Sequence, residues 1–336
     1  MSRVRLHVAI EPLQLATPFR ISGHVFSSHD VVVVTLVKGS YAGRGEASGV
    51  YYLSEDAAVM VATIEKVRAA IEDGADRVAL QSLLPPCGAR NALDCAMWEL
   101  EAAEAGKPVW ELAGLSAPRP LETTFTLGAD TPEKMAEGAR NYSHAKRIKV
   151  KLTGDAEDDI GRIEAIRAAR PEVWLAVDAN QGFTRDTIKL VMQALTACGV
   201  SLLEQPFARG DEGALDGFDS PIPVAADESA LSLADIDGLV GRFDIVNIKL
   251  DKCGGLTEGL AMARAARARD LGVMVGNMVG TSLAMAPAYV LGQLCEVVDL
   301  DGPIFLTEDR KPSIRYADGL VTCDDNIWGS GKPVQP

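Results

Sequence analysis

Several residue types and patterns are scarce in this chain of 336 residues, and each absence narrows the choice of function. Four histidines are too few for a histidine-rich zinc site, and none follows a strand-like run in the second half of the chain. The longest apolar stretch near the N-terminus, Val31–Val37, is far too short to span a bilayer. Positive charge is also scarce, since 33 lysines and arginines face 47 acidic residues for a net charge of −14. No nucleic-acid or membrane partner is therefore expected.

Cysteine pairs at metal-binding or redox spacing are missing as well. The six cysteines stand at positions 87, 95, 198, 253, 295 and 323. Because no two of them are closely spaced, they predict no zinc or redox motif, and we interpret them as reduced residues of a cytoplasmic protein. The N-terminal run Arg3–Ile10 alternates like a strand rather than like a signal peptide.

The first part of the chain shows strand-like and then helical patterns. Residues 1 to about 55 alternate like antiparallel strands around a polar stretch, Thr17–Asp30. Residues 54–114 follow a helical period instead. Strands first and helices after, without alternation, predict an α+β domain over residues 1–115.

The rest of the chain alternates strand-like and helical runs at intervals of roughly 20 to 25 residues, as βα units require. The strand-like runs are Thr124–Leu127, Ile148–Leu152, Leu175–Asn180, Leu202–Pro206, Val224–Ser229, Ile245–Asp251, Val273–Met278 and Val297–Asp301. This number of strands predicts a (β/α)8-type barrel over residues 116–303, with a doubly wound sheet as the alternative. Residues 304–336 lack the rhythm and are predicted to return and complete the N-terminal α+β domain.

Three consecutive runs carry a carboxylate at or near their ends: Asp178, Glu204 and Asp227. One such residue alone is often a helix cap. Three of them at one end of a barrel would each need a partner, because an unpaired buried charge is costly. A single hard cation would serve all three, and oxygen ligands suit Mg²⁺ better than zinc. We therefore predict a Mg²⁺ site formed by these residues.

Lysines stand at the ends of two other runs. Lys149 and Lys151 belong to the second run and Lys249 to the sixth. Second and sixth strands are opposite in an eight-stranded barrel, so Lys151 and Lys249 are predicted to approach a substrate from opposite faces. That is the arrangement a 1,1-proton transfer needs. A lysine has a pKa of about 10.4 when unperturbed, and a neighbouring cation, either Lys149 or the metal, lowers it toward the range of a useful base.

The eighth run ends in Asp299-Leu300-Asp301. From the pattern alone, this pair either anchors the last loop at the barrel rim or binds a cationic group of a substrate.

The residues above resemble those of the enolase superfamily, in its muconate-lactonizing subgroup. Lys149-Val150-Lys151 is similar to the subgroup's K-x-K, and Ala89–Trp98 is similar to a helical signature of its capping domain. Within the subgroup, the segments Asn247–Glu258 and Asp299–Pro303 look most like those of dipeptide epimerases, especially L-Ala-D/L-Glu epimerases.

The resemblance implies roles for individual residues. Asp178, Glu204 and Asp227 match the metal ligands, and Lys151, Lys249 and Lys149 match the catalytic lysines. Asp299 and Asp301 match a pair that binds the α-ammonium group of a dipeptide. Loops around residues 17–30 and 48–54 would close over the site.

One position departs from the family pattern. L-Ala-D/L-Glu epimerases carry an arginine in the first capping loop that receives the glutamate side chain of the substrate. This chain has Gly23 or His24 there, with Arg20 nearby, so we take Arg20 and His24 as candidate substrate contacts.

These expectations combine into a cytoplasmic, Mg²⁺-dependent dipeptide epimerase acting on a small-molecule dipeptide, L-Ala-D/L-Glu or a related one. The alternatives on the same scaffold are an N-acylamino-acid racemase, an o-succinylbenzoate synthase and a muconate-type cycloisomerase. A catalytically silent protein that binds metal or ligand is the alternative outside enzymes. Association into a homo-oligomer is left open.

Overall fold

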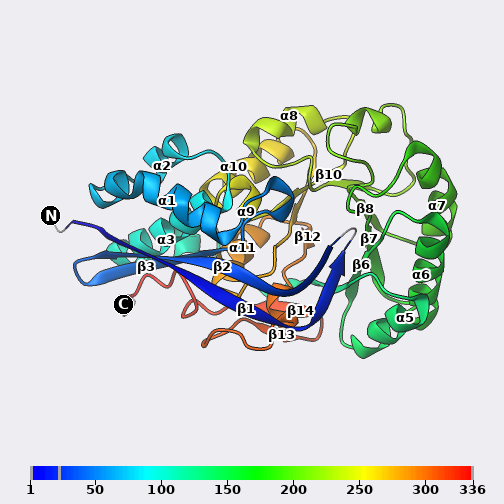
Figure 1. The fold of residues 1–336 in the computed structure, drawn as a ribbon, viewed down its shortest axis with the longest axis horizontal. Helices are drawn as coiled ribbons and strands as arrows, with labels where there is room; N and C mark the ends of the chain where they lie inside the picture. Colours follow the sequence, from blue (N-terminus) through cyan, green and yellow to red (C-terminus); the bar gives the residue numbers. More distant parts are fainter. Residues whose placement is uncertain (1–2, 22–23, 334–336) are drawn as a thin grey trace.

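A long antiparallel sheet opens the computed structural model, which describes residues 3–21 and 24–333. Its strands are β1 (Arg5–Ile21), β2 (His24–Lys38) and β3 (Tyr41–Ala47), paired in that order (Figure 1). Leu6 and Leu13 are buried between exposed neighbours, as the alternation of a strand requires. The polar stretch over residues 17–30, expected as a loop, lies largely within β1 and β2, because backbone pairing continues beyond the apolar pattern.

Helical segments cover one face of this sheet. They are η1 (Tyr51–Leu53), α1 (Ala57–Glu72), α2 (Arg77–Leu83), α3 (Gly88–Ala105) and α4 (Val109–Leu112). Helix α3 lies so close to β3 that a β-carbon added at Gly43 would be 2.1 Å from the carbonyl oxygen of Ala96. Gly45 meets the carbonyl oxygen of Ala92 at the same distance, so glycine is needed at both positions.

Parallel strands alternate with helices through the rest of the chain and, within residues 24–333, form one eight-stranded sheet that curls into a nearly closed barrel (Figure 1). The strands are β5 (Thr124–Leu127), β6 (Arg147–Lys151), β7 (Trp174–Asp178), β8 (Leu202–Glu204), β9 (Val224–Ala226), β10 (Ile245–Ile248), β11 (Gly272–Val275) and β12 (Val297–Val298). Each predicted run overlaps one of these strands. The predicted (β/α)8 architecture is confirmed.

Helices connect the barrel strands. The segments are α5 (Pro132–Asn141), α6 (Ala156–Ala169), α7 (Arg185–Ala197), η2 (Glu212–Leu215), η3 (Leu233–Asp235), α8 (Ile236–Leu239), α9 (Leu250–Cys253), α10 (Leu256–Arg267), α11 (Ser282–Gly292) and η4 (Gly302–Phe305). Alternate strand residues pack against these helices, as Val150 and Val177 do in the main core. A second, smaller cluster that includes Ala176 and Ala225 is separate from that core. Because Ala176 lies beside Lys149 in register, its small side chain leaves room for the buried lysine.

The C-terminal segment returns to the N-terminal domain, as predicted. Strands β13 (Arg315–Ala317) and β14 (Leu320–Thr322) form a small sheet with β4 (Leu121–Glu122). Beyond it, the Trp328 indole donates a hydrogen bond to the Arg44 carbonyl (2.9 Å), and the Arg44 guanidinium donates to the Ile327 carbonyl (2.8 Å). The tail therefore completes the packing of the N-terminal sheet.

Helix α3 also fastens the N-terminal domain to the barrel. Arg90 donates to the carbonyls of Cys253 (2.6 Å) and Gly254 (3.2 Å) at the C-terminal end of α9. Asp94 accepts a hydrogen bond from the Thr257 backbone N–H at 2.9 Å. These contacts hold α3 against the barrel. Among the described residues, no helix has the length and apolar character needed to cross a membrane.

Candidate active site

An open pocket of about 790 Å³ lies at the C-terminal ends of the barrel strands. Barrel residues supply its floor, and Tyr51 and Tyr52 of η1 contribute from the N-terminal domain. Enzymes of this architecture carry out their chemistry at this end, because side chains from several strands converge there.

Three carboxylates meet at one side of this pocket. Asp178 ends β7, Glu204 ends β8 and Asp227 follows β9, and each is at most 1% exposed. One oxygen from each lies within 4.8 Å of the others. In-register pairing of Asp178 with Glu204 brings the first two together. Three buried like charges at this spacing, all with oxygen donors, fit a hard divalent cation such as Mg²⁺. The predicted residues therefore form a group suited to that metal.

Further acceptors support this fit. Asn180 Oδ1 and Glu228 Oε2 line the same pocket, are buried and have no hydrogen-bond partner among the described residues. Burial and the neighbouring charge of Asp178 raise the pKa of Glu204 to about 8. A cation between these carboxylates would remove the repulsion that favours the protonated form.

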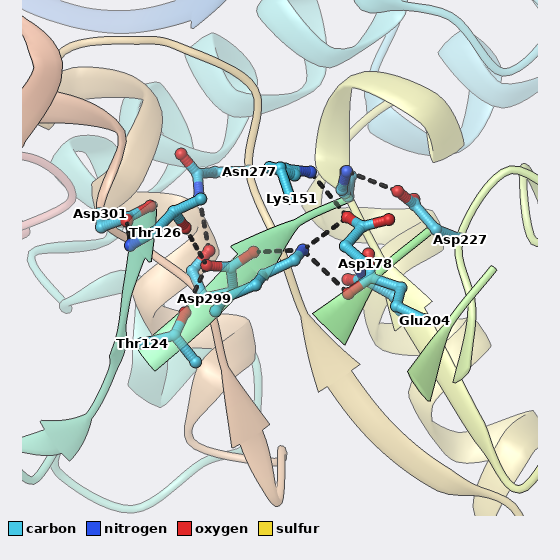
Figure 2. A network of polar contacts seen from close by, with 12 residues as sticks. Thr124, Thr126, Lys151, Asp178, Glu204, Asp227, Asn277, Asp299 and Asp301 are labelled. Carbon is cyan, nitrogen blue, oxygen red and sulfur yellow. Dashed lines mark hydrogen bonds and ion pairs between the residues drawn. The ribbon is translucent and has the colours of Figure 1, made fainter. Parts of the chain in front are cut away.

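Lysine ammonium groups neutralise the same carboxylates from within the chain. Lys151 lies 2.6 Å from Asp178, and Lys249 lies 2.7 Å from Asp227 (Figure 2). Lys149 contacts Glu204 at 2.8 Å and Asp178 at 3.1 Å. All three lysines and all three carboxylates are thus held in one charge network.

The network sets the protonation of its members. Burial alone would raise the pKa of Asp178, but Lys151 and Lys149 hold that pKa below its usual range. The pKa of Lys249 is raised, because burial, which lowers it, is outweighed by the attraction of Asp227. Added positive charge between the carboxylates acts in the opposite direction on Lys249.

Lys151 and Lys249 come from opposite sides of the barrel. Lys151 ends β6, the second strand, and Lys249 directly follows β10, the sixth. Both line the pocket, and both are less than a tenth exposed. A molecule held between them faces one amine on each side, which suits removal of a proton from one face of a carbon and its return to the other.

Asp299 and Asp301 follow β12 and also line the pocket. Asp299 pairs with Lys149 at 2.9 Å, and Asp301 accepts a hydrogen bond from the Thr126 backbone N–H at 2.6 Å (Figure 2). Burial, together with the charge of Asp299, raises the pKa of Asp301 to about 7. The pocket thus has carboxylates at two places, and Lys149 contacts both.

Comparisons with known proteins agree with this architecture. Residues 3–114 match the family described as mandelate racemase / muconate lactonizing enzyme, N-terminal domain, and residues 133–329 match the enolase C-terminal domain-like family. The chain belongs to the enolase superfamily.

Its superfamily relatives include racemases and epimerases. The chain is 39% identical over 311 residues to L-Ala-D/L-Glu epimerase of Escherichia coli (strain K12), covering 92% of this chain and 96% of the relative. It is also 39% identical over 305 residues to N-acetyl-D-glutamate racemase of a Pseudoalteromonas species, covering 89% and 95%.

Among solved structures, an enolase family member from Agrobacterium tumefaciens with homology to dipeptide epimerases has a TM-score of 0.94 at 38% identity. The match covers 97% of this chain and all of the other. That structure contains bound sodium and L-Ala-L-Glu.

Several pocket residues of this superfamily member escaped the sequence argument. The N-terminal domain contributes His29, Tyr51 and Tyr52, and the loop after β11 contributes Asn277. Glu228 could have been proposed from the sequence as a further site residue, since it directly follows the candidate metal ligand Asp227. The segments that carry His29, Tyr51 and Tyr52 were expected near the site from the family resemblance, but no local pattern singled out these side chains, because they reach the pocket from another domain.

Two predicted substrate contacts are not tested. The backbone of Arg20 pairs with Val25, and that of His24 pairs with Ile21. The side chains of Arg20 and His24 lie outside the described part of the structure, as does Gly23 altogether. Arg20 and His24 therefore stay predictions.

Proposed function

We propose that this protein is a Mg²⁺-dependent dipeptide epimerase that inverts the α-carbon of the C-terminal residue of its substrate. The observation that carries the proposal is the placement of Lys151 and Lys249 on opposite sides of a pocket that has carboxylates at two places. Sequence similarity to L-Ala-D/L-Glu epimerase supports dipeptides as the substrate class.

The pocket fits the two charged ends of a dipeptide. Asp178, Glu204 and Asp227 would hold a Mg²⁺ ion, which would supply fixed positive charge near the C-terminal carboxylate, where negative charge develops as the α-proton leaves. The α-ammonium group lies at the end of the pocket that carries Asp299 and Asp301. Fixing both ends places the α-carbon between the lysines and measures the length of a dipeptide.

Each of the two lysines then exchanges a proton with one face of the α-carbon. One lysine enters as the neutral amine and takes the α-proton, so that a carbon–hydrogen bond breaks and a nitrogen–hydrogen bond forms. The other enters as the ammonium ion and gives its proton to the opposite face of the same carbon. The reverse reaction exchanges their roles. Lys149, buried between the carboxylates, stabilises the enolate oxygen through its positive charge.

A second candidate is racemisation of N-acylamino acids, which the relative named N-acetyl-D-glutamate racemase supports. Such substrates have no ammonium group. They leave Asp301, which forms no ion pair within the described residues, without a cation, and this is why we favour dipeptides. We also propose a cytoplasmic location, on the support of cysteines that are all free.

Incubation of a mixed L,L-dipeptide library in D₂O with Mg²⁺ tests the proposal, with N-acyl amino acids in a parallel pool and EDTA-treated protein as control. We expect deuterium at the α-carbon of C-terminal residues, read by mass spectrometry, and none with EDTA. The labelled members define the side chains that the pocket accepts. Labelling of the N-acyl pool alone would favour the second candidate and contradict the first.

A further inference from the structure

Gln205 directly follows the candidate metal ligand Glu204 at the end of β8, and its backbone is strained. Its φ of 35° lies in the left-handed region, which favours glycine over residues that carry a side chain. The residue is also buried, with an exposed fraction of 1%. A strained conformation persists only where the surrounding structure holds it, and here the side chain of Gln205 makes the contacts that do so.

The side-chain amide of Gln205 uses all of its hydrogen-bonding positions. Its Oε1 accepts from the backbone N–H groups of Asp227 (2.8 Å) and Ser229 (3.1 Å). Its Nε2 donates to the Phe207 carbonyl (3.0 Å) and to the Ser229 hydroxyl (2.8 Å). Two N–H groups on one side and a carbonyl on the other fix the orientation of the amide. Gln205 thus connects β8 with Asp227, the first residue after β9.

The main-chain carbonyl of Gln205 has a different partner from the one that the sheet would give it. The Gln205 N–H donates to the Ala225 carbonyl (2.9 Å). The next bond of this parallel ladder would run from the Asp227 N–H to the Gln205 carbonyl. That carbonyl instead accepts from the Gln181 N–H at 2.8 Å, in the segment after β7, and the side-chain Oε1 takes its place at Asp227. One residue therefore links the segments that follow β7, β8 and β9.

Each of these three strands carries a candidate metal ligand at its end, namely Asp178, Glu204 and Asp227 (Figure 2). Gln181 lies three positions after Asp178, and Gln205 is bonded to Glu204 through the chain. A shift of any one segment would change the spacing of the ligand oxygens, which lie within 4.8 Å of one another. Mg²⁺ is small and requires nearly ideal octahedral geometry, whereas the larger Ca²⁺ accepts variable geometry.

We propose that Gln205 is a positioning residue that sets the spacing of the three ligands and thereby the preference of the site for Mg²⁺ over Ca²⁺. The proposal rests on the Mg²⁺ site of the proposed epimerase and adds the residue that determines its selectivity. Gln205 does not line the pocket, so it acts through the ligands and not on the substrate.

Gln205→Gly tests the role of the side chain, because glycine suits this backbone conformation and removes only the amide contacts. Isothermal titration calorimetry on metal-free protein should give a Kd for Mg²⁺ that is about 10- to 100-fold higher than in the wild type, as for loss of other groups that orient ligands. The Kd for Ca²⁺ should rise by a smaller factor. Unchanged affinities, or equal losses for the two ions, would overturn the positioning role.

Gln181→Gly is the matched control. Gln181 also has a positive φ, 67°, and glycine keeps the backbone N–H that donates to Gln205. Its side chain accepts a hydrogen bond from the Arg209 backbone N–H (2.9 Å) and not from a candidate metal ligand. Gln181→Gly should bind both ions like the wild type. Equal losses of Mg²⁺ affinity in the two glycine variants would assign the effect to a more flexible backbone and overturn the role of the Gln205 side chain.

Gln205→Met provides a second test if Gln205→Gly fails to fold. Methionine fills a similar volume but leaves the Asp227 N–H without its acceptor. Its Mg²⁺ affinity should fall, and by a larger factor than its Ca²⁺ affinity. A folded Gln205→Met with the Mg²⁺ affinity of the wild type would overturn the proposal.

Calorimetry of the wild type distinguishes this proposal from the proposed function. Absence of Mg²⁺ binding by the wild type would overturn the metal site, and with it both the Mg²⁺-dependent function and the role of Gln205. Binding of Mg²⁺ by the wild type, with the same preference over Ca²⁺ in Gln205→Gly, would overturn the role of Gln205 alone.

Discussion

The buried carboxylates at the two ends of the pocket differ in how they are paired. At the metal end, Asp178, Glu204 and Asp227 each contact at least one lysine of the same chain. At the other end, Asp301 is also buried, but within the described residues it has hydrogen bonds from Thr126 and no ion pair. Carboxylates that are paired with lysines of the chain can stay together when no substrate is bound. A buried carboxylate without such a pair instead favours binding of a cationic ligand. The following predictions test this comparison.

The largest effect is expected at Lys151 and Lys249, which line the pocket from opposite sides of the barrel. Lys151→Ala and Lys249→Ala should each lower epimerisation by about 10²- to 10⁴-fold, the contribution typical of a positioned acid or base. In each variant the remaining lysine still faces one side of the carbon. Residual α-proton exchange in D₂O should therefore be confined to one epimer, and to opposite epimers in the two variants.

Lys146→Ala is the matched control, because Lys146 lies next to β6 but pairs with the exposed Glu122 at 3.4 Å, away from the pocket. It should behave like the wild type. Full exchange of both epimers by Lys151→Ala and by Lys249→Ala would remove these residues from the mechanism.

A smaller effect is expected from the group that orients one metal ligand. Asn247 is fully buried, and its side-chain N–H donates to Glu204 Oε1 at 2.9 Å. Asn247→Ala should weaken Mg²⁺ binding about 10- to 100-fold, measured by calorimetry. The exposed Asn141→Ala is the control. A folded Asn247→Ala with normal Mg²⁺ affinity would show that the strands alone orient Glu204.

The smallest effect is expected at Asp251, which can be compared with Asp301. Asp251 is also a buried carboxylate, and burial raises its pKa to about 7, but it lies between the domains and accepts hydrogen bonds from the Ser48 N–H (2.9 Å) and the Asn91 amide (3.4 Å). Asp251 therefore tests whether a buried acid without a cation always indicates a ligand. We expect that it affects stability only.

The raised pKa of Asp251 determines how its contribution to protein stability changes with pH. Folded protein retains the Asp251 proton at pH values where the unfolded chain, near its ordinary value of 3.8, has lost it. Wild-type stability should therefore fall relative to Asp251→Asn as pH rises from about 4 to about 7, and the difference should stay constant above that. Urea unfolding at several pH values measures it. A gap between wild type and variant that is constant from pH 4 to 8 would contradict the prediction, and Mg²⁺ affinity should be equal in both.

Much of the barrel could be predicted from the sequence, because its strands are continuous apolar runs that end in charge. The runs that contain Asp178 and Glu204 give strands ending at those two residues. Asp227, Lys249 and Asp299 instead lie just beyond strands, since the paired registers end at Ala226, Ile248 and Val298. Residues 17–30 were expected as a loop, whereas 17–21 lie in β1 and 24–30 lie in β2. The expectation was wrong because polar composition does not report backbone pairing.

The sequence by itself determined the order of strands, the carboxylates and lysines at their ends, and the family, since each depends on local pattern and spacing. Tertiary structure alone decided which charges are neutralised by the chain. The link of Lys149 to Asp299 spans 150 positions, and the approach of Tyr51 and Tyr52 to the pocket depends on how one domain docks on another. Neither can be read from local pattern, because electrostatic partners are chosen by distance in space, and that distance is set by closure of the barrel and packing of the domain above it.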